Sequence, residues 1–264
     1  MDATLDALLE EIETHDERGD RTALQTLVAE GRSRFPDAIE LREWEATLAI
    51  DDARYQDALT ILDEILVHQP DDFAARRERA SVLVDLGRFS DALDALTALP
   101  TVEVRALPRS ERAGMAHERG LCLDRLDRFA DADAAYRDAT RLDPQHYFLP
   151  ARHPRDAFET LVADALDEIP ELFRPFLAQV IVTIQTWPEP LATDPFQLGL
   201  YVGVPRSERT SATEDHLDTI VVYQRSHELQ CADDVALRSE VRKTVLHEIA
   251  HHFGLEDGEM GGCE

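Results

Sequence analysis

The stretch His247-Glu248-Ile249-Ala250-His251-His252-Phe253-Gly254-Leu255-Glu256-Asp257 determines how the C-terminal half of the chain is interpreted. Its first five residues follow the pattern H-E-x-x-H. On an α-helix, residues i and i+4 lie about 40° apart around the axis, so His247 and His251 would project from one face. Neutral imidazoles are favoured zinc ligands, and this pair predicts a Zn²⁺ site. Glu248 would point about 100° away from His247, where it can accept a proton from a water on the metal without coordinating it.

The flanking residues predict that this stretch belongs to one long helix. Asp233 and Asp234 offer side-chain oxygens for an N-cap. An apolar residue recurs at every fourth position along the stretch, at Leu237, Val241, Val245, Ile249 and Phe253. Gly254 follows, where helices commonly end in the left-handed conformation. We therefore expect a helix of roughly 20 residues that ends at Gly254.

A catalytic zinc usually has three protein ligands and leaves the fourth position to water. A sharp turn at Gly254 would bring Asp257 back toward the two histidines, giving the pattern H-E-x-x-H-x-x-G-x-x-D. Glu256 is the alternative third ligand. His252 lies about 100° from His251 and is expected to face solvent or the packing of its own domain. The simpler alternative for the stretch is an ordinary core helix with partly exposed histidines.

The residues from position 157 to the start of this helix predict a small α+β domain. The pattern is helical over 157–166, a short second helix is expected over 171–177, and β-branched runs predict strands over 179–184, 198–204 and 219–224. Residues 206–218 are polar and read as a flap over the site or as a plain surface loop.

This order of elements resembles the compact bacterial zincin-like family, whose members are described as zinc metallopeptidases. The matching segments are Phe158–Val162, Leu198–Gly203, Ile220–Tyr223 and Val245–Leu255. The resemblance implies a Zn²⁺ ion held by His247, His251 and Asp257, with Glu248 as the base.

The first 146 residues contain a repeat with a period of 34 residues. Tyr55 and Phe89, Ala58 and Ala92, Leu62 and Leu96, and Pro36 and Pro70 are each separated by that period. A further copy contains Gly120, Phe129 and Ala132, displaced by an insertion that we expect to form a loop over 101–112.

This pattern resembles the tetratricopeptide repeat, a 34-residue helix–turn–helix unit. Small residues would lie where the two helices of a copy touch, at Ala46 and Ala58, Ala80 and Ala92, and Gly120 and Ala132. The segment 5–38 reads as a degenerate first copy, which gives about four helix pairs. Such copies bury their apolar faces by stacking. The resemblance implies a concave groove that binds a peptide or protein partner, with a spacer or dimerisation surface as the alternative.

The domain boundary is expected near residue 150, because the repeat pattern ends there and Pro150 and Pro154 lie in the linker. The sequence therefore predicts an α+β protein, with an all-α solenoid over 1–150 and a zincin-like domain over 151–264.

The composition narrows the classes of partner. The formal net charge is −27, which disfavours binding to nucleic acid and to anionic membranes. No run of 18 apolar residues occurs, so no membrane span is expected. The three cysteines are scattered and odd in number, and the N-terminus lacks the features of a secretory signal. We therefore expect a cytoplasmic protein. Cys122 is expected in the core, and Cys263 as a surface thiol.

These features predict a zinc-dependent peptidase whose repeats recruit a protein substrate or partner. An extended peptide is expected to pair with an edge strand, assigned here to residues 219–224. Tyr223 and Tyr201 are candidate donors to the oxyanion, with core packing as the alternative role of each. Two other functions remain open: a repeat scaffold whose zincin domain binds metal with little catalysis, and a metal-dependent hydrolase of non-peptide bonds.

Overall fold

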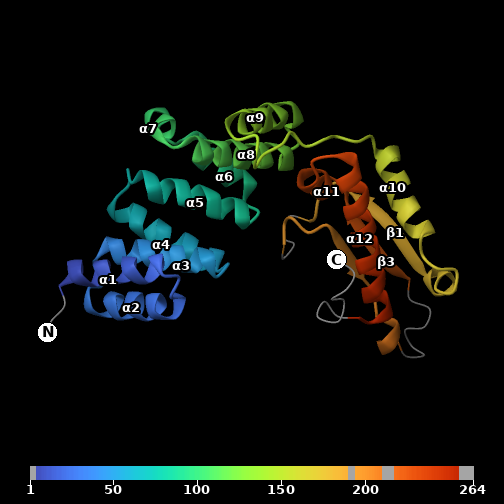
Figure 1. The fold of residues 1–264 in the computed structure, drawn as a ribbon, viewed down its shortest axis with the longest axis horizontal. Helices are drawn as coiled ribbons and strands as arrows, with labels where there is room; N and C mark the ends of the chain where they lie inside the picture. The colour runs from blue at the N-terminus through green and yellow to red at the C-terminus, as the bar shows by residue number, and fades with distance from the viewer. Residues whose placement is uncertain (1–3, 190–193, 210–216, 256–264) are drawn as a thin grey trace. The chain divides into compact units, whose positions relative to one another are not determined.

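The computed structural model of the protein describes residues 4–189, 194–209 and 217–255, and the chain divides into two compact units, Met1–Tyr147 and Phe148–Glu264. The first unit is all-helical and the second contains a small sheet with helices, as Figure 1 shows. Asp257, Glu256 and Cys263 lie outside the described residues.

The described part of the first unit, residues 4–147, contains four antiparallel helix pairs that stack in chain order (Figure 1). The pairs are α1 (Leu5–Glu17) with α2 (Arg21–Arg34), α3 (Ile39–Asp51) with α4 (Tyr55–His68), α5 (Phe73–Asp85) with α6 (Phe89–Thr97), and α8 (Arg109–Arg125) with α9 (Phe129–Leu142). The predicted small residues are completely buried at these contacts, including Ala46, Ala58, Ala80, Ala92 and Ala132. The unit is a tetratricopeptide-type array.

Two details of the array concern individual predictions. Cys122 is completely buried in the core, as expected. The inserted segment is not the loop that the sequence suggested, because residues Thr101–Ala106 form a short helix, α7, and α8 begins directly after Pro108. Proline has a fixed φ angle and no backbone N–H group, and both properties suit the start of a helix. A helix that begins directly after Pro108 is therefore consistent with the sequence.

The second unit begins with helix α10 (Arg155–Asp167), followed by a 3-10 turn η1 (Arg174–Leu177) and strand β1 (Val180–Gln185). Strand β2 (Gly199–Val202), a 3-10 turn η2 (Arg206–Glu208) and strand β3 (Asp218–Tyr223) follow. Two helices complete the unit, α11 (Gln224–Gln230) and α12 (Asp234–Phe253). Helix α11 was not expected from the sequence.

The sheet has the strand order β1-β3-β2 in the described residues. Strand β3 pairs with β1 in parallel and with β2 antiparallel. The prediction that residues 219–224 form an edge strand is therefore wrong. Continuous β-branched character in Thr219–Val222 reflects burial on both sides, which is the environment of a central strand. The strand at the edge beside the histidine helix is β2.

The core of this unit lies between the sheet and helices α10 and α12 (Figure 1). The apolar positions predicted at four-residue spacing are buried in it, at Leu237, Val241, Val245 and Ile249, with Phe253 partly buried. Ile220 and Val222 of β3 face them and are completely buried. This packing holds one face of α12 against the sheet.

Helix α12 has the two ends that the sequence predicted. The Asp233 side chain accepts hydrogen bonds from the backbone N–H groups of Val235 (3.0 Å) and Ala236 (2.8 Å). Gly254 ends the helix in the left-handed region, with φ 90°. A residue with a Cβ atom would be strained there. The ends fix the register of the helix and therefore the direction of each histidine.

Candidate metal centre

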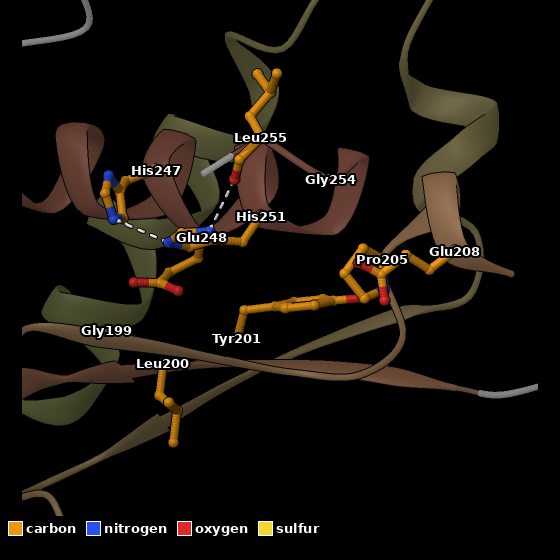
Figure 2. Close-up of a pocket in the computed structure, with 10 residues that line it drawn as sticks. All are labelled: Gly199, Leu200, Tyr201, Pro205, Glu208, His247, Glu248, His251, Gly254 and Leu255. Atoms are coloured by element: carbon orange, nitrogen blue, oxygen red, sulfur yellow. Dashed lines mark hydrogen bonds between the residues drawn. The ribbon is translucent and has the colours of Figure 1, made fainter. Parts of the chain in front are cut away.

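His247 and His251 project together from the exposed side of α12. Their Nε2 atoms are 3.1 Å apart, and a dashed line joins the two side chains in Figure 2. The planes of the two rings are perpendicular. The Nδ1 atom of His251 lies 3.0 Å from the carbonyl oxygen of Leu255. Because a carbonyl can only accept, Nδ1 carries the hydrogen, and Nε2 of His251 presents a lone pair toward His247.

This geometry suits a zinc ion. Two nitrogens that bind a tetrahedral zinc at about 2.1 Å lie about 3.4 Å apart, close to the separation of the two Nε2 atoms. The hydrogen bond to Leu255 sets the tautomer that such binding needs. No group of three His, Cys, Asp or Glu side chains that could hold a metal occurs among the described residues. Both candidates for a third ligand, Asp257 and Glu256, lie outside those residues.

Glu248 is the buried member of the motif, with 6% of its surface exposed. Its carboxylate is directed toward strand β2, as Figure 2 shows. A Cβ atom on Gly199 would lie 2.6 Å from Oε1 of Glu248 and 2.7 Å from Cγ2 of Thr244, so any larger residue would have to displace these side chains or the strand. Glycine lets the edge strand approach the carboxylate closely.

The motif lines a cleft of about 460 Å³ that is formed by α12, β2 and the turn η2. His247, Glu248 and His251 come from α12, and Gly199, Leu200 and Tyr201 come from β2. Pro205 and Glu208 border the cleft at the end opposite His247 (Figure 2). The cleft therefore brings together a pair of histidines, a carboxylate and an edge strand.

His252 is completely buried, so it belongs to the packing of the domain, which was one of its two expected positions. Its Nδ1 atom lies 2.6 Å from Oδ2 of Asp218, and its Nε2 atom lies 3.1 Å from the carbonyl oxygen of Phe176. The Tyr201 hydroxyl donates to the same Asp218 oxygen at 2.8 Å, and Arg209 donates to it as well. Asp218 thus connects α12, β2 and the segment after η2.

Asp218 is ionised in this arrangement. Burial alone would raise the pKa of its carboxyl, but hydrogen bonds from Tyr201 and His252 and the charge of Arg209 outweigh burial and lower the pKa. Sequence reasoning missed this residue, because it treated position 218 as the end of a polar loop. The only feature of the sequence that could have indicated a role for Asp218 is the position of an acidic residue immediately before an apolar run.

A second buried contact, between His227 and Thr244, lies next to the motif. His227 of α11 is completely buried, and its Nδ1 donates to the carbonyl oxygen of Tyr223 at 2.8 Å. Its Nε2 therefore accepts from the Thr244 hydroxyl, at 3.0 Å. Thr244 lies one turn before Glu248, with its methyl group against Gly199. Sequence reasoning did not single out either residue, because α11 was not expected.

The two tyrosines considered as oxyanion donors differ in position. Tyr201 lines the cleft, but its hydroxyl is bonded to Asp218, and burial followed by that bond raises its pKa. Tyr223 has only 2% of its surface exposed and accepts a hydrogen bond from Gln197 at 3.4 Å. Burial is also the main cause of the raised pKa of Tyr223. Neither hydroxyl is directed freely into the cleft.

Comparison with known proteins identifies the class of the C-terminal region. Residues 177–264 match the sequence profile of a family described as "Zincin-like metallopeptidase". The match includes the three strands, η2, α11, α12 and the H-E-x-x-H motif. This part of the chain is therefore a zincin-like domain, which follows a tetratricopeptide-type array.

Several solved structures are similar to about half of the chain. MamA 41-end from Desulfovibrio magneticus RS-1 has 22% sequence identity and a TM-score of 0.45, with 53% of this chain and 76% of that chain covered. MamA AMB-1 has 19% identity and a TM-score of 0.45, with 54% and 82% covered. No curated protein matches the chain. Among the described residues, no helix has the length and apolar character needed to cross a membrane.

Proposed function

We propose that the protein is a zinc-dependent peptidase whose repeat array recruits a protein substrate or partner. The observation that supports this most directly is the pair of Nε2 atoms 3.1 Å apart, beside a buried carboxylate and an edge strand in one cleft. A scaffold would need the fold of the domain, but it would not need Glu248 in that position. The family match of residues 177–264 supports the same class of reaction.

In this proposal His247, His251 and Asp257 hold the zinc ion, and Glu256 is the alternative third ligand. When bound, the ion polarises a scissile carbonyl and makes water more acidic. Glu248 takes a proton from the attacking water and returns it to the leaving amine. Burial of this carboxylate beside Gly199 keeps it in one orientation, so proton transfer needs little rearrangement.

Strand β2 replaces residues 219–224 as the expected site of substrate pairing. It is an edge strand in the described residues, it lines the cleft, and its Gly199 lies beside Glu248. An extended peptide that pairs with the outer edge of β2 would place a backbone carbonyl near the two histidines. Neither tyrosine is well placed to donate to the oxyanion, because the Tyr201 hydroxyl is hydrogen-bonded to Asp218 and Tyr223 is buried.

The repeat array is proposed to bind basic or neutral segments of a protein partner. Neighbouring helices α3 and α5 bring carboxylates close together: the pKa of Glu43 is raised by burial and then by Asp72, Glu40 and Glu78. A basic segment would relieve this repulsion. The described cysteines, Cys122 and Cys231, are buried free thiols, which supports a reducing compartment such as the cytoplasm.

The test uses the full-length protein, its zinc content and a library of unstructured peptides. We expect close to one zinc per chain, cleavage of a subset of peptides, and loss of cleavage after chelation with recovery on adding zinc. Glu248→Gln keeps the shape and the metal but removes the base, so turnover should fall by more than about 100-fold. Glu171→Gln, an exposed acid outside the cleft, is the matched control.

The same experiment separates the alternatives. Zinc binding without cleavage of any peptide, and with no effect of Glu248→Gln, would support a scaffold that binds metal. Chelator-sensitive cleavage of small esters or amides, but not of peptides, would support a hydrolase of non-peptide bonds. Activity of the Glu248→Gln variant equal to that of the unsubstituted protein would remove Glu248 as the base.

A further inference from the structure

The turn η2 places a charged residue at the end of the cleft. Glu208 is exposed and lines the cleft together with Pro205, and Figure 2 shows both at the end opposite His247. The turn and the residue after it contain three charged side chains, Arg206, Glu208 and Arg209. The charge of a molecule that can bind in the cleft depends on which of these three side chains faces it.

The two arginines are held by other contacts. Arg209 donates to Asp218, to Oε1 of Gln179 at 3.0 Å and to the carbonyl oxygen of Val204 at 3.0 Å. The guanidinium of Arg206 lies over the ring of Phe176, 4.7 Å from its centroid. Neither arginine lines the cleft. The turn therefore presents only the carboxylate of Glu208 to it.

The turn is also fixed relative to the histidine helix. A Cβ atom on Gly254 would overlap the side chain of Ser207, so the turn packs directly on the end of α12. Asp218, which accepts from Arg209, also accepts from His252 of α12. These contacts hold the backbone of Glu208 at a set position relative to His247 and His251.

The side chains that line the cleft beside Glu208 do not neutralise its charge. No lysine or arginine lines the cleft within the described residues, and no cation among those residues forms an ion pair with Glu208. Glu248 is the other acidic lining residue and is buried beside β2. An anionic group bound beside Glu208 would therefore meet repulsion from this carboxylate, because the proposed zinc ion would lie at the histidine pair, toward the other end of the cleft.

We propose that Glu208 selects substrates that carry a cationic group close to the bond that is cleaved. The group is a Lys or Arg side chain or the free amino terminus of a peptide, since both supply a cation to the carboxylate. This inference rests on the proposed function, because it assumes that a peptide occupies the cleft. It assigns to Glu208 the choice of substrate, and it leaves the proton transfers to Glu248.

Binding tests this without depending on turnover. The full-length Glu248→Gln variant, loaded with zinc, is titrated with short unstructured peptides in which one position carries Lys, norleucine or Glu. Each peptide is made with a free or an acetylated amino terminus, which separates the two sources of the cation. We expect the best cationic peptide to bind about fivefold more tightly than its norleucine counterpart at low salt, and the difference to shrink as salt is added.

The variants at position 208 decide the outcome. Glu208→Gln should abolish the preference, and Glu208→Lys should reverse it in favour of the Glu peptide. Glu171→Gln should leave it unchanged. A preference that persists in Glu208→Gln, no preference at all, or no binding of any peptide would each overturn the proposal. Turnover by the unsubstituted protein is measured in parallel: cleavage without charge preference overturns only the role of Glu208, and charge-dependent binding without cleavage overturns only the hydrolysis.

Discussion

A Cβ atom added to Gly199 would lie 2.6 Å from Oε1 of Glu248. A side chain at position 199 would therefore have to displace the proposed base, and glycine at this position allows the edge strand to lie beside it. This contact lies within a domain whose core is formed by other residues, so it can be altered while most of the packing is kept.

The substitution Gly199→Ala tests this contact. The added methyl group must displace Glu248, Thr244 or the strand, at a cost of about 1–3 kcal/mol in the free energy of unfolding. A displacement of the base of about 1 Å lowers turnover by about 100-fold, while the histidines still bind zinc. The checks are zinc per chain, thermal unfolding and peptide turnover.

Gly114→Ala is the matched control, because a Cβ atom there would meet the Tyr147 hydroxyl at an ordinary contact distance of 3.4 Å. It also replaces Gly by Ala inside helix α8, which favours the helix. Unchanged turnover in Gly199→Ala would show that the distance between β2 and Glu248 has no role in the reaction.

Two adjacent histidines are expected to respond differently to substitution. His251→Ala removes a proposed zinc ligand from the exposed side of α12 and should lose the metal with little change in the fold. His252→Ala removes one of the buried donors to Asp218 and the donor to the Phe176 carbonyl, and it leaves a cavity, which should together cost about 2–4 kcal/mol. Zinc content and chemical denaturation of both variants provide the comparison. Equal loss of stability in the two variants would contradict these assignments.

The third zinc ligand can be identified by a pair of substitutions. Asp257→Ala should weaken zinc binding by more than about 100-fold, because even groups that only orient a ligand change metal affinity by about 10–100-fold. Glu256→Ala should leave the affinity close to its original value. Competition with a coloured chelator measures both. The reverse result would assign the ligand to Glu256, and two unaffected variants would exclude both residues.

Stability of the second unit should depend on pH through His227. Burial lowers the pKa of this imidazole, so below about pH 6.5 the unfolded chain binds a proton that the folded chain does not. The free energy of unfolding should therefore be constant near pH 7–8 and fall by up to about 1.4 kcal/mol per pH unit below 6.5. Asp218, whose pKa is lowered, adds its own loss only below about pH 4.

The measurement uses a Trp44→Phe background, in which Trp187 of the second unit is the remaining tryptophan. Urea denaturation followed by its fluorescence then reports on this unit. His227→Gln should flatten the dependence between pH 5 and 6.5. His117→Gln is the control, since the pKa of His117 is also lowered by burial but that residue lies in the first unit. A slope that His227→Gln does not change would assign the dependence to other groups.

Local patterns in the sequence were enough to predict helix α12, with its Asp233 cap and its end at Gly254. They also predicted the helix pairs of the array, because the small residues recur at a fixed spacing. The strands were placed correctly along the chain, but residues 219–224 were wrongly assigned to the edge of the sheet. Strand order depends on how distant segments pair, and the continuous β-branched run in residues 219–222 indicated a buried strand without identifying its partners.

The contacts around the site were not accessible to sequence reasoning for a similar reason. Asp218, Arg209, Tyr201 and His252 come together from four segments, and none of their spacings is regular. His227 and Thr244 meet only because α11 turns back onto α12. A helical motif fixes directions around one axis, so it revealed His247, Glu248 and His251 but not the residues that support them.

The short length of strand β2 limits which proteins could be processed. With four residues, Gly199–Val202, and one edge paired to β3, it offers backbone partners to only a few residues of an incoming chain. That chain must be extended to reach them. Folded domains hide such segments within their own sheets and helices, so the accessible targets would be chain termini, linkers and polypeptides that have not yet folded or have lost their fold.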